Sequence, residues 1–180
     1  LAIDSTHASL GRLMQTIEAG SVDLILMPEV TLPVFPKAEV HTGFIAPIRN
    51  FARDIGVPIV FGATGFTGDI LGDFTPFNSA FLMDPGGLTG FQYDKRYLVP
   101  FVERVPVLPD SWLTGLPYFG GFGVGTGWPL LEVNGSTYGV LICYESTYPE
   151  GARTFRLKGA EVLLNITNDA WYGREPLYSR

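Results

Sequence analysis

Residues 139 to 151, GVLICYESTYPEG, place the only cysteine of the chain, Cys143, at the end of an apolar run. The strand that this run predicts follows Asn134-Gly135, a pair that favours a tight hairpin turn after the short apolar segment PLLEV. Cys143 therefore stands where a strand ends. At this point it is either a small buried residue of the core or a nucleophile presented at the edge of a sheet.

The segments around this hairpin alternate between helix and strand patterns. Apolar residues at helical spacing predict helices over 5–19, 44–55 and 148–160. Apolar runs predict buried strands over 23–29, 57–64 and 161–168, and a further hairpin that joins 77–84 to 88–95. This alternation indicates a layered α/β domain, and 180 residues with 46% hydrophobic side chains are enough for one core.

The charge balance argues against several classes of partner and cofactor. A net charge of −6 with only 12 Lys and Arg gives no basic cluster for nucleic acid and no basic membrane-binding helix. One cysteine permits no internal disulfide. One cysteine and two scattered histidines also lack the spacing of metal ligands, so we expect neither a metal nor another cofactor.

One segment, residues 112–131, has twenty uncharged residues, which is the length of a membrane span. Its six glycines and two prolines make a stable helix unfavourable. We expect instead an aromatic loop that covers a pocket or touches a lipid surface, and an ordinary surface loop is the alternative.

Three polar residues with useful chemistry each follow a predicted strand: Glu29, Lys95 and Cys143. A cysteine attacks as the thiolate, so it needs a nearby base or cation. His7 and His41 do not stand at strand ends, which disfavours a Cys-His pair. A carboxylate could accept the thiol proton and a lysine could stabilise an oxyanion, although each of the three residues also has an ordinary structural interpretation.

Four sequence blocks occur in an order that resembles a known family. They are PEV at 28–30, YDKRYLVPFVERVP at 93–106, ICYESTYPE at 142–150 and LLNITNDAWYG at 163–173. Together they resemble the apolipoprotein N-acyltransferase branch of the carbon-nitrogen hydrolase, or nitrilase, superfamily. The resemblance implies a nitrilase-like α-β-β-α sandwich. It also implies that residues 1–180 are a catalytic domain truncated at both ends, with membrane helices upstream.

The resemblance assigns roles to individual residues. Glu29 matches the general base, Lys95 the oxyanion stabiliser and Cys143 the nucleophile. Val102 stands where the family pattern has glycine, which leaves the pose of the following glutamate open. The remaining matches are a second essential carboxylate at Glu103, residues that support the nucleophile turn at Tyr144 and Glu145, and pocket residues at Asn168 and Trp171.

By the same resemblance, the enzyme moves a fatty acyl chain from a phospholipid to a thioester on Cys143. The acyl chain then passes to the α-amine of the diacylglyceryl-cysteine of an apolipoprotein. We therefore expect the catalytic domain on the periplasmic side of a bacterial inner membrane, with Trp112 and Phe119 in a lipid-facing loop. A soluble amidase or nitrilase with the same three residues, and a catalytically inactive binding module, are the alternatives.

Overall fold

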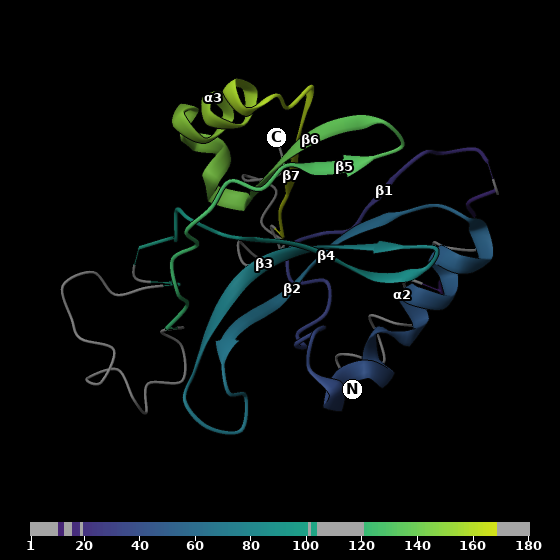
Figure 1. The fold of residues 1–180 in the computed structure, drawn as a ribbon, viewed down its shortest axis with the longest axis horizontal. Helices are drawn as coiled ribbons and strands as arrows, with labels where there is room; N and C mark the ends of the chain where they lie inside the picture. The colour runs from purple at the N-terminus through teal and green to yellow at the C-terminus, as the bar shows by residue number, and fades with distance from the viewer. Residues whose placement is uncertain (1–10, 13–15, 19, 101, 104–120, 169–180) are drawn as a thin grey trace, which may run out of the picture.

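The computed structural model describes residues 11–12, 16–18, 20–100, 102–103 and 121–168. In this part of the chain, two β-sheets face each other and each carries a helix on its outer side (Figure 1). From one side to the other the layers are α3, a three-stranded sheet, a four-stranded sheet and α2. The α-β-β-α sandwich expected from the sequence is therefore present.

The four-stranded sheet has the order β1-β2-β3-β4. Its strands are β1 (Ile25–Leu26), β2 (Ile59–Gly68), β3 (Phe74–Asp84) and β4 (Gly87–Asp94). β1 is parallel to β2, and the next two pairs are antiparallel. A 3-10 turn, η1 (Glu39–His41), leads into α2 (Thr42–Ile55), which ends at Gly56 with the left-handed backbone that favours glycine.

The three-stranded sheet has the order β5-β6-β7. It consists of β5 (Leu131–Val133), β6 (Ser136–Ile142) and β7 (Val162–Ile166). Asn134 and Gly135 both have positive φ, as the predicted hairpin turn requires, and join β5 to β6. A 3-10 turn, η3 (Cys143–Thr147), and α3 (Pro149–Lys158) connect β6 to the parallel strand β7.

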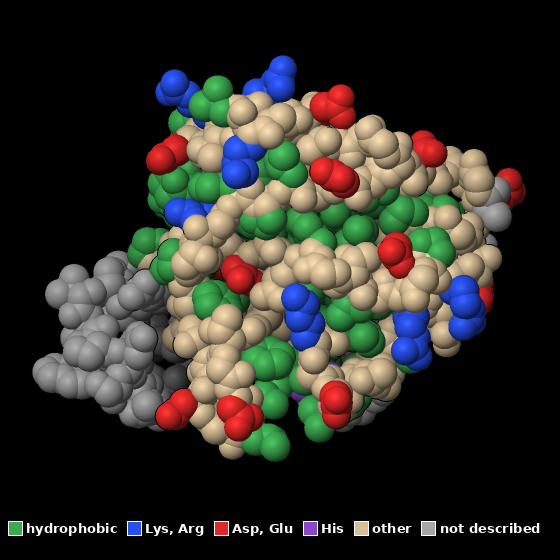
Figure 2. Space-filling model, in the orientation of Figure 1, with side chains coloured by type: hydrophobic (Ala, Val, Ile, Leu, Met, Phe, Trp, Pro, Cys, Tyr) green, Lys and Arg blue, Asp and Glu red, His purple; other side chains and the backbone are tan. Residues whose placement is uncertain are grey.

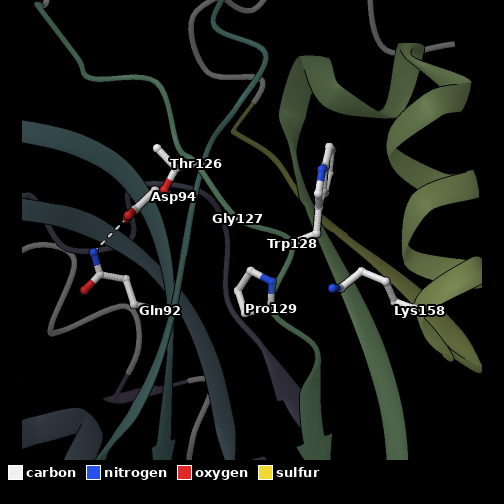
Figure 3. A pocket seen from close by; sticks show the side chains of 7 residues that line it. All are labelled: Gln92, Asp94, Thr126, Gly127, Trp128, Pro129 and Lys158. Carbon is white, nitrogen blue, oxygen red and sulfur yellow. Dashed lines mark hydrogen bonds between the residues drawn. The ribbon is translucent and has the colours of Figure 1, made fainter.

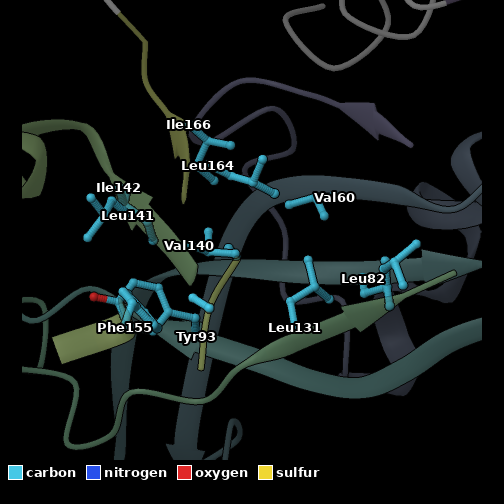
Figure 4. Close-up of a cluster of buried hydrophobic side chains, with 13 residues drawn as sticks. Val60, Leu82, Tyr93, Leu131, Val140, Leu141, Ile142, Phe155, Leu164 and Ile166 are labelled. Carbon is cyan, nitrogen blue, oxygen red and sulfur yellow. The ribbon is translucent and has the colours of Figure 1, made fainter. Parts of the chain in front are cut away.

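Two hydrophobic clusters hold the layers together. The first lies between the sheets and includes Val60, Leu82 and Tyr93 from one sheet with Val140 and Ile142 from the other (Figure 4). α3 adds its Phe155 side chain to this cluster. The second cluster packs α2, through residues such as Ile48 and Ala52, onto the opposite face of the four-stranded sheet. Burial of these side chains fixes which residues of each strand face the interior.

The structure changes three of the expected boundaries. The helix predicted over 5–19 falls mostly outside the described residues, and of it Gly11 and Arg12 are helical whereas residues 16–18 are not. The strand expected over 23–29 is only Ile25–Leu26, because Pro28 lacks an N–H and Val30 turns the backbone to φ 48°. β2 and β3 are longer than expected and pair along their whole length as a hairpin.

The segment expected to be an aromatic loop is described only in its second part. Residues 121–130 have no regular secondary structure, and 112–120, with Trp112 and Phe119, lie outside the described residues. None of the described helices is both long enough and apolar enough to cross a bilayer.

Candidate active site

Cys143 lies at the point where β6 gives way to η3. Its backbone adopts φ 53°, a left-handed conformation that is unfavourable for a residue with a Cβ atom. The turn therefore takes the chain abruptly out of the sheet at the cysteine, and the side chain is left partly accessible. Such a position is suited to a nucleophile at the mouth of a site.

Glu29 reaches the same region from the other sheet. Its turn follows β1, where the N–H of Gly62 donates to the Pro28 carbonyl at 3.2 Å and the Thr31 hydroxyl donates to that carbonyl at 2.5 Å. The absence of a side chain on Gly62 allows this approach, since a Cβ atom there would lie 2.7 Å from the Glu29 Cα. Glu29 itself is buried, with 4% of its surface exposed.

Lys95 follows β4 and lies between two buried carboxylates. Its Nζ is 3.1 Å from Glu29 Oε1 and 2.9 Å from Glu103 Oε2, and its side chain is 1% exposed. Burial alone would lower the pKa of this ammonium, but the two carboxylates outweigh burial and raise it. Lys95 is therefore charged at neutral pH.

Glu103 keeps its place although Val102 precedes it. Val102 is half exposed, whereas the Glu103 carboxylate accepts a hydrogen bond from the Val99 N–H at 2.8 Å. The Glu103 N–H in turn donates to the Val99 carbonyl at 3.0 Å. This local turn fixes the carboxylate, so a valine before it is compatible with its contact to Lys95.

Asn78 lies in the site, although no sequence pattern indicated it. Its Nδ2 donates to Glu29 Oε1 at 2.7 Å and to Glu103 Oε1 at 2.6 Å. It lies on β3, 3% exposed, and thus bridges the two carboxylates that also flank Lys95. A single asparagine inside an apolar strand carries no local signal, because its partners lie 49 and 25 positions away.

The Cys143 thiol interacts with groups from three other segments. Burial raises its pKa above the ordinary value of 9.0, and a hydrogen bond with the Thr167 side chain opposes that effect. The negative charge of Glu29 and a hydrogen bond with its carboxylate raise the pKa further, and the charge of Lys95 lowers it. Glu29 therefore contacts both the thiol and the lysine, and the three residues predicted from sequence meet at one place.

Glu145 anchors the nucleophile turn to β4. It is fully buried and accepts hydrogen bonds from the N–H groups of Ile142, at 2.8 Å, and Arg96, at 2.7 Å. The Tyr93 hydroxyl donates to both of its oxygens. Burial raises the pKa of Glu145, and these donors partly offset the shift by stabilising the carboxylate.

Tyr144 faces an aromatic cluster beside the turn. Its ring meets Tyr148 edge-on at 5.2 Å, and the Tyr148 hydroxyl donates to the Tyr144 hydroxyl at 3.2 Å. Tyr148 in turn stacks on Tyr97 with centroids 4.4 Å apart. These contacts hold the Tyr144 ring in place, and its support of the nucleophile turn stays a prediction.

The remaining candidates differ in what the structure describes. The Asn168 amide makes a long hydrogen bond, 3.5 Å, to the Glu29 carbonyl, which places it beside the site. Trp171 and His7 lie outside the described residues. His41 accepts a hydrogen bond from the Phe35 N–H and stacks on the Phe35 ring. Within the described residues, no group of three or more His, Cys, Asp or Glu side chains could hold a metal ion.

A separate groove of about 400 Å³ runs along the edge of β4 (Figure 3). None of the candidate catalytic, supporting or pocket residues lines this groove, and Gln92 and Asp94 alternate with Tyr93 along β4. Residues 126–129, which do line it, belong to the segment 112–131 that was expected to form an aromatic loop. The full lining of the groove is Gln92, Asp94, Thr126, Gly127, Trp128, Pro129 and Lys158.

On the face of the molecule shown in Figure 2, Lys and Arg side chains are scattered among Asp and Glu side chains.

Comparison with known proteins decides the family. The sequence model of the carbon-nitrogen hydrolase family matches residues 3–178. The chain belongs to this family. Among its relatives are the apolipoprotein N-acyltransferases of Geobacter metallireducens, 35% identical over 162 residues, and of Bdellovibrio bacteriovorus, 30% identical over 182 residues. The alignments cover 87% and 96% of this carbon-nitrogen hydrolase chain but only 30% and 32% of those two proteins.

Solved structures of the superfamily share the fold. An amidase from Nesterenkonia sp. AN1 superposes with a TM-score of 0.58 at 22% identity, over 96% of this chain and 63% of the amidase. A carbon-nitrogen hydrolase from Helicobacter pylori G27 gives a TM-score of 0.60 at 21% identity, over 92% of this chain and 53% of that protein. At these identities the comparison supports the sandwich architecture.

Proposed function

We propose that this chain is the catalytic part of an apolipoprotein N-acyltransferase. The observation that carries the proposal is the position of the Glu29 carboxylate, which contacts both the Cys143 thiol and the Lys95 ammonium. The two N-acyltransferase relatives support the choice of reaction. In this proposal Glu29 is the general base, Cys143 the nucleophile and Lys95 the oxyanion donor.

The reaction proceeds in two acyl transfers. Glu29 takes the proton of the Cys143 thiol while the thiolate attacks an ester carbonyl of a phospholipid. Lys95, with a backbone N–H near Tyr144, stabilises the oxyanion. The lysophospholipid leaves with the proton held by Glu29, and a thioester remains on Cys143.

In the second transfer, the α-amine of the diacylglyceryl-cysteine of an apolipoprotein attacks the thioester. Glu29 accepts the amine proton, the C–S bond breaks, and the proton returns to the Cys143 sulfur. A catalytic domain on the periplasmic side of a bacterial inner membrane would give the site access to both lipid substrates. Trp112 and Phe119 would face the lipid in this arrangement.

Intact-mass analysis of the full-length protein in phospholipid vesicles tests the proposal. We expect a mass increase of one acyl chain that is absent in Cys143→Ala and strongly reduced in Glu29→Gln. Addition of a diacylglyceryl lipopeptide should remove the adduct and yield an N-acylated peptide. Loss of the adduct to water at the same rate with and without the lipopeptide would instead identify a hydrolase. Failure of a folded protein to form any adduct would identify a binding module.

A further inference from the structure

Thr167 lies beside the nucleophile for a reason of strand register. β6 and β7 are parallel, and their last paired residues are Ile142 and Ile166. Cys143 and Thr167 are the next residues of each strand, so they leave the same edge of the sheet side by side. Both Ile142 and Ile166 are buried in the core between the sheets, which fixes this register.

The Thr167 side chain makes a hydrogen bond with the Cys143 side chain. A hydroxyl group can donate to a sulfur atom, and the donation is stronger when the sulfur is charged. Such a donated hydrogen bond favours the thiolate over the thiol and lowers the pKa of Cys143, against the effect of burial. None of the four sequence blocks gave Thr167 a role, since a threonine at the end of a β-rich segment is common.

We propose that the Thr167 hydroxyl is a catalytic group that stabilises the Cys143 thiolate in both acyl transfers. This role rests on the proposed use of Cys143 as the nucleophile. In the first transfer the thiol proton moves to Glu29 while Thr167 keeps its own proton and donates a hydrogen bond to the forming thiolate. In the second, the electron pair of the breaking C–S bond returns to the sulfur, and the same hydroxyl stabilises the leaving thiolate.

The charged groups near the thiol do not depend on the Thr167 hydroxyl. Glu29 and Lys95 act directly on the thiol, with opposite effects. Glu103 contacts Lys95, and Glu145, in the same turn as Cys143, is bonded to Tyr93 and to backbone N–H groups. Removal of the Thr167 hydroxyl alters none of these charges, so a change in the titration of Cys143 would report the hydrogen bond itself.

The test compares Thr167→Val, which keeps the shape, with Thr167→Ser, which keeps the hydroxyl. Alkylation of Cys143 by iodoacetamide is followed in the full-length protein from about pH 6 to about pH 10. We expect Thr167→Val to move the midpoint upward, with alkylation about tenfold slower at neutral pH, because a hydrogen bond to a charged acceptor is lost. Thr167→Ser should titrate like the unchanged protein.

The control is Thr89→Val, which removes a hydroxyl that donates to the Leu82 carbonyl in the other sheet. It should leave the alkylation midpoint unchanged. A Thr167→Val protein that titrates like the unchanged protein would overturn the inference. A Thr167→Ser protein that titrates like Thr167→Val would also overturn it. The serine variant therefore keeps the inference testable even if valine disturbs the fold. Alkylation requires no acyl donor, so these outcomes do not depend on whether the protein acylates itself from phospholipid.

Discussion

The hydroxyl of Tyr93 donates to both carboxylate oxygens of Glu145, at 2.8 and 2.9 Å, and joins residues 52 positions apart. Both side chains are fully buried. Glu145 also accepts hydrogen bonds from the backbone N–H of Ile142, which precedes the nucleophile, and from that of Arg96, which follows Lys95. One buried carboxylate therefore fixes the nucleophile turn relative to the segment that carries the lysine.

Replacement of Tyr93 by phenylalanine should destabilise the protein by about 1 to 3 kcal/mol, because a buried carboxylate loses a donor. The Tyr93 hydrogen bond lowers the pKa of Glu145, so its contribution is present where Glu145 is ionised and is lost as the pH falls through that pKa. Urea unfolding at a series of pH values should show a difference between the two proteins that narrows toward acid pH. Tyr138→Phe, which removes the hydroxyl of a partly buried tyrosine on β6, is the control and should show no such narrowing.

Replacement of Asn78 should affect catalysis through the two carboxylates that it bridges. Asn78→Ala removes both hydrogen bonds and should slow acylation of Cys143 by about tenfold or more, since Glu29 loses a contact that orients it. Asn78→Asp should be more harmful, because it adds a third carboxylate to a buried site that holds one lysine. Intact-mass analysis of samples quenched at a series of times gives the rate of adduct formation for each variant. An aspartate variant faster than the alanine variant would contradict the bridging role.

Lys95 should contribute to stability and to catalysis in separable ways. Lys95→Met leaves two buried carboxylates without a cation and should destabilise the protein by about 3 to 5 kcal/mol. The double variant Lys95→Met/Glu103→Gln removes one of these charges and should recover part of the stability. Both variants should acylate about 100- to 1,000-fold more slowly, because the oxyanion donor is absent from each. Recovery of activity in the double variant would show that Lys95 acts only in folding.

Gly62 should be required for the position of Glu29. A Cβ atom there would lie 2.5 Å from the Val30 nitrogen and 2.8 Å from the Pro28 oxygen, so Gly62→Ala must push the Glu29 turn away from β2. We expect a large loss of acylation rate. Gly90→Ala on β4 is the matched control, because a Cβ atom there would meet nothing within 4 Å. Equal activity of the two alanine variants would show that the Glu29 turn tolerates displacement.

Local sequence patterns were sufficient for much of the fold. The apolar spacing before Gly56 predicted α2, and Asn134-Gly135 predicted the β5–β6 hairpin. Both signals come from residues that are neighbours in the chain, where backbone preference and the period of burial act directly. The pairing of β2 with β3 was not predicted, and the outer ends of both strands were missed because the residues near Gly68 and Phe74 are exposed and carry no buried alternation.

The sequence alone determined the order Glu29, Lys95, Cys143, each after a strand, and through its motifs the family. Only the tertiary structure decided which other side chains meet them: Asn78 between the carboxylates, Tyr93 beneath the nucleophile turn and Thr167 at the sulfur. These contacts depend on strand register and on the packing of one sheet against the other. Both are set by burial across the whole domain, which no local stretch of sequence encodes.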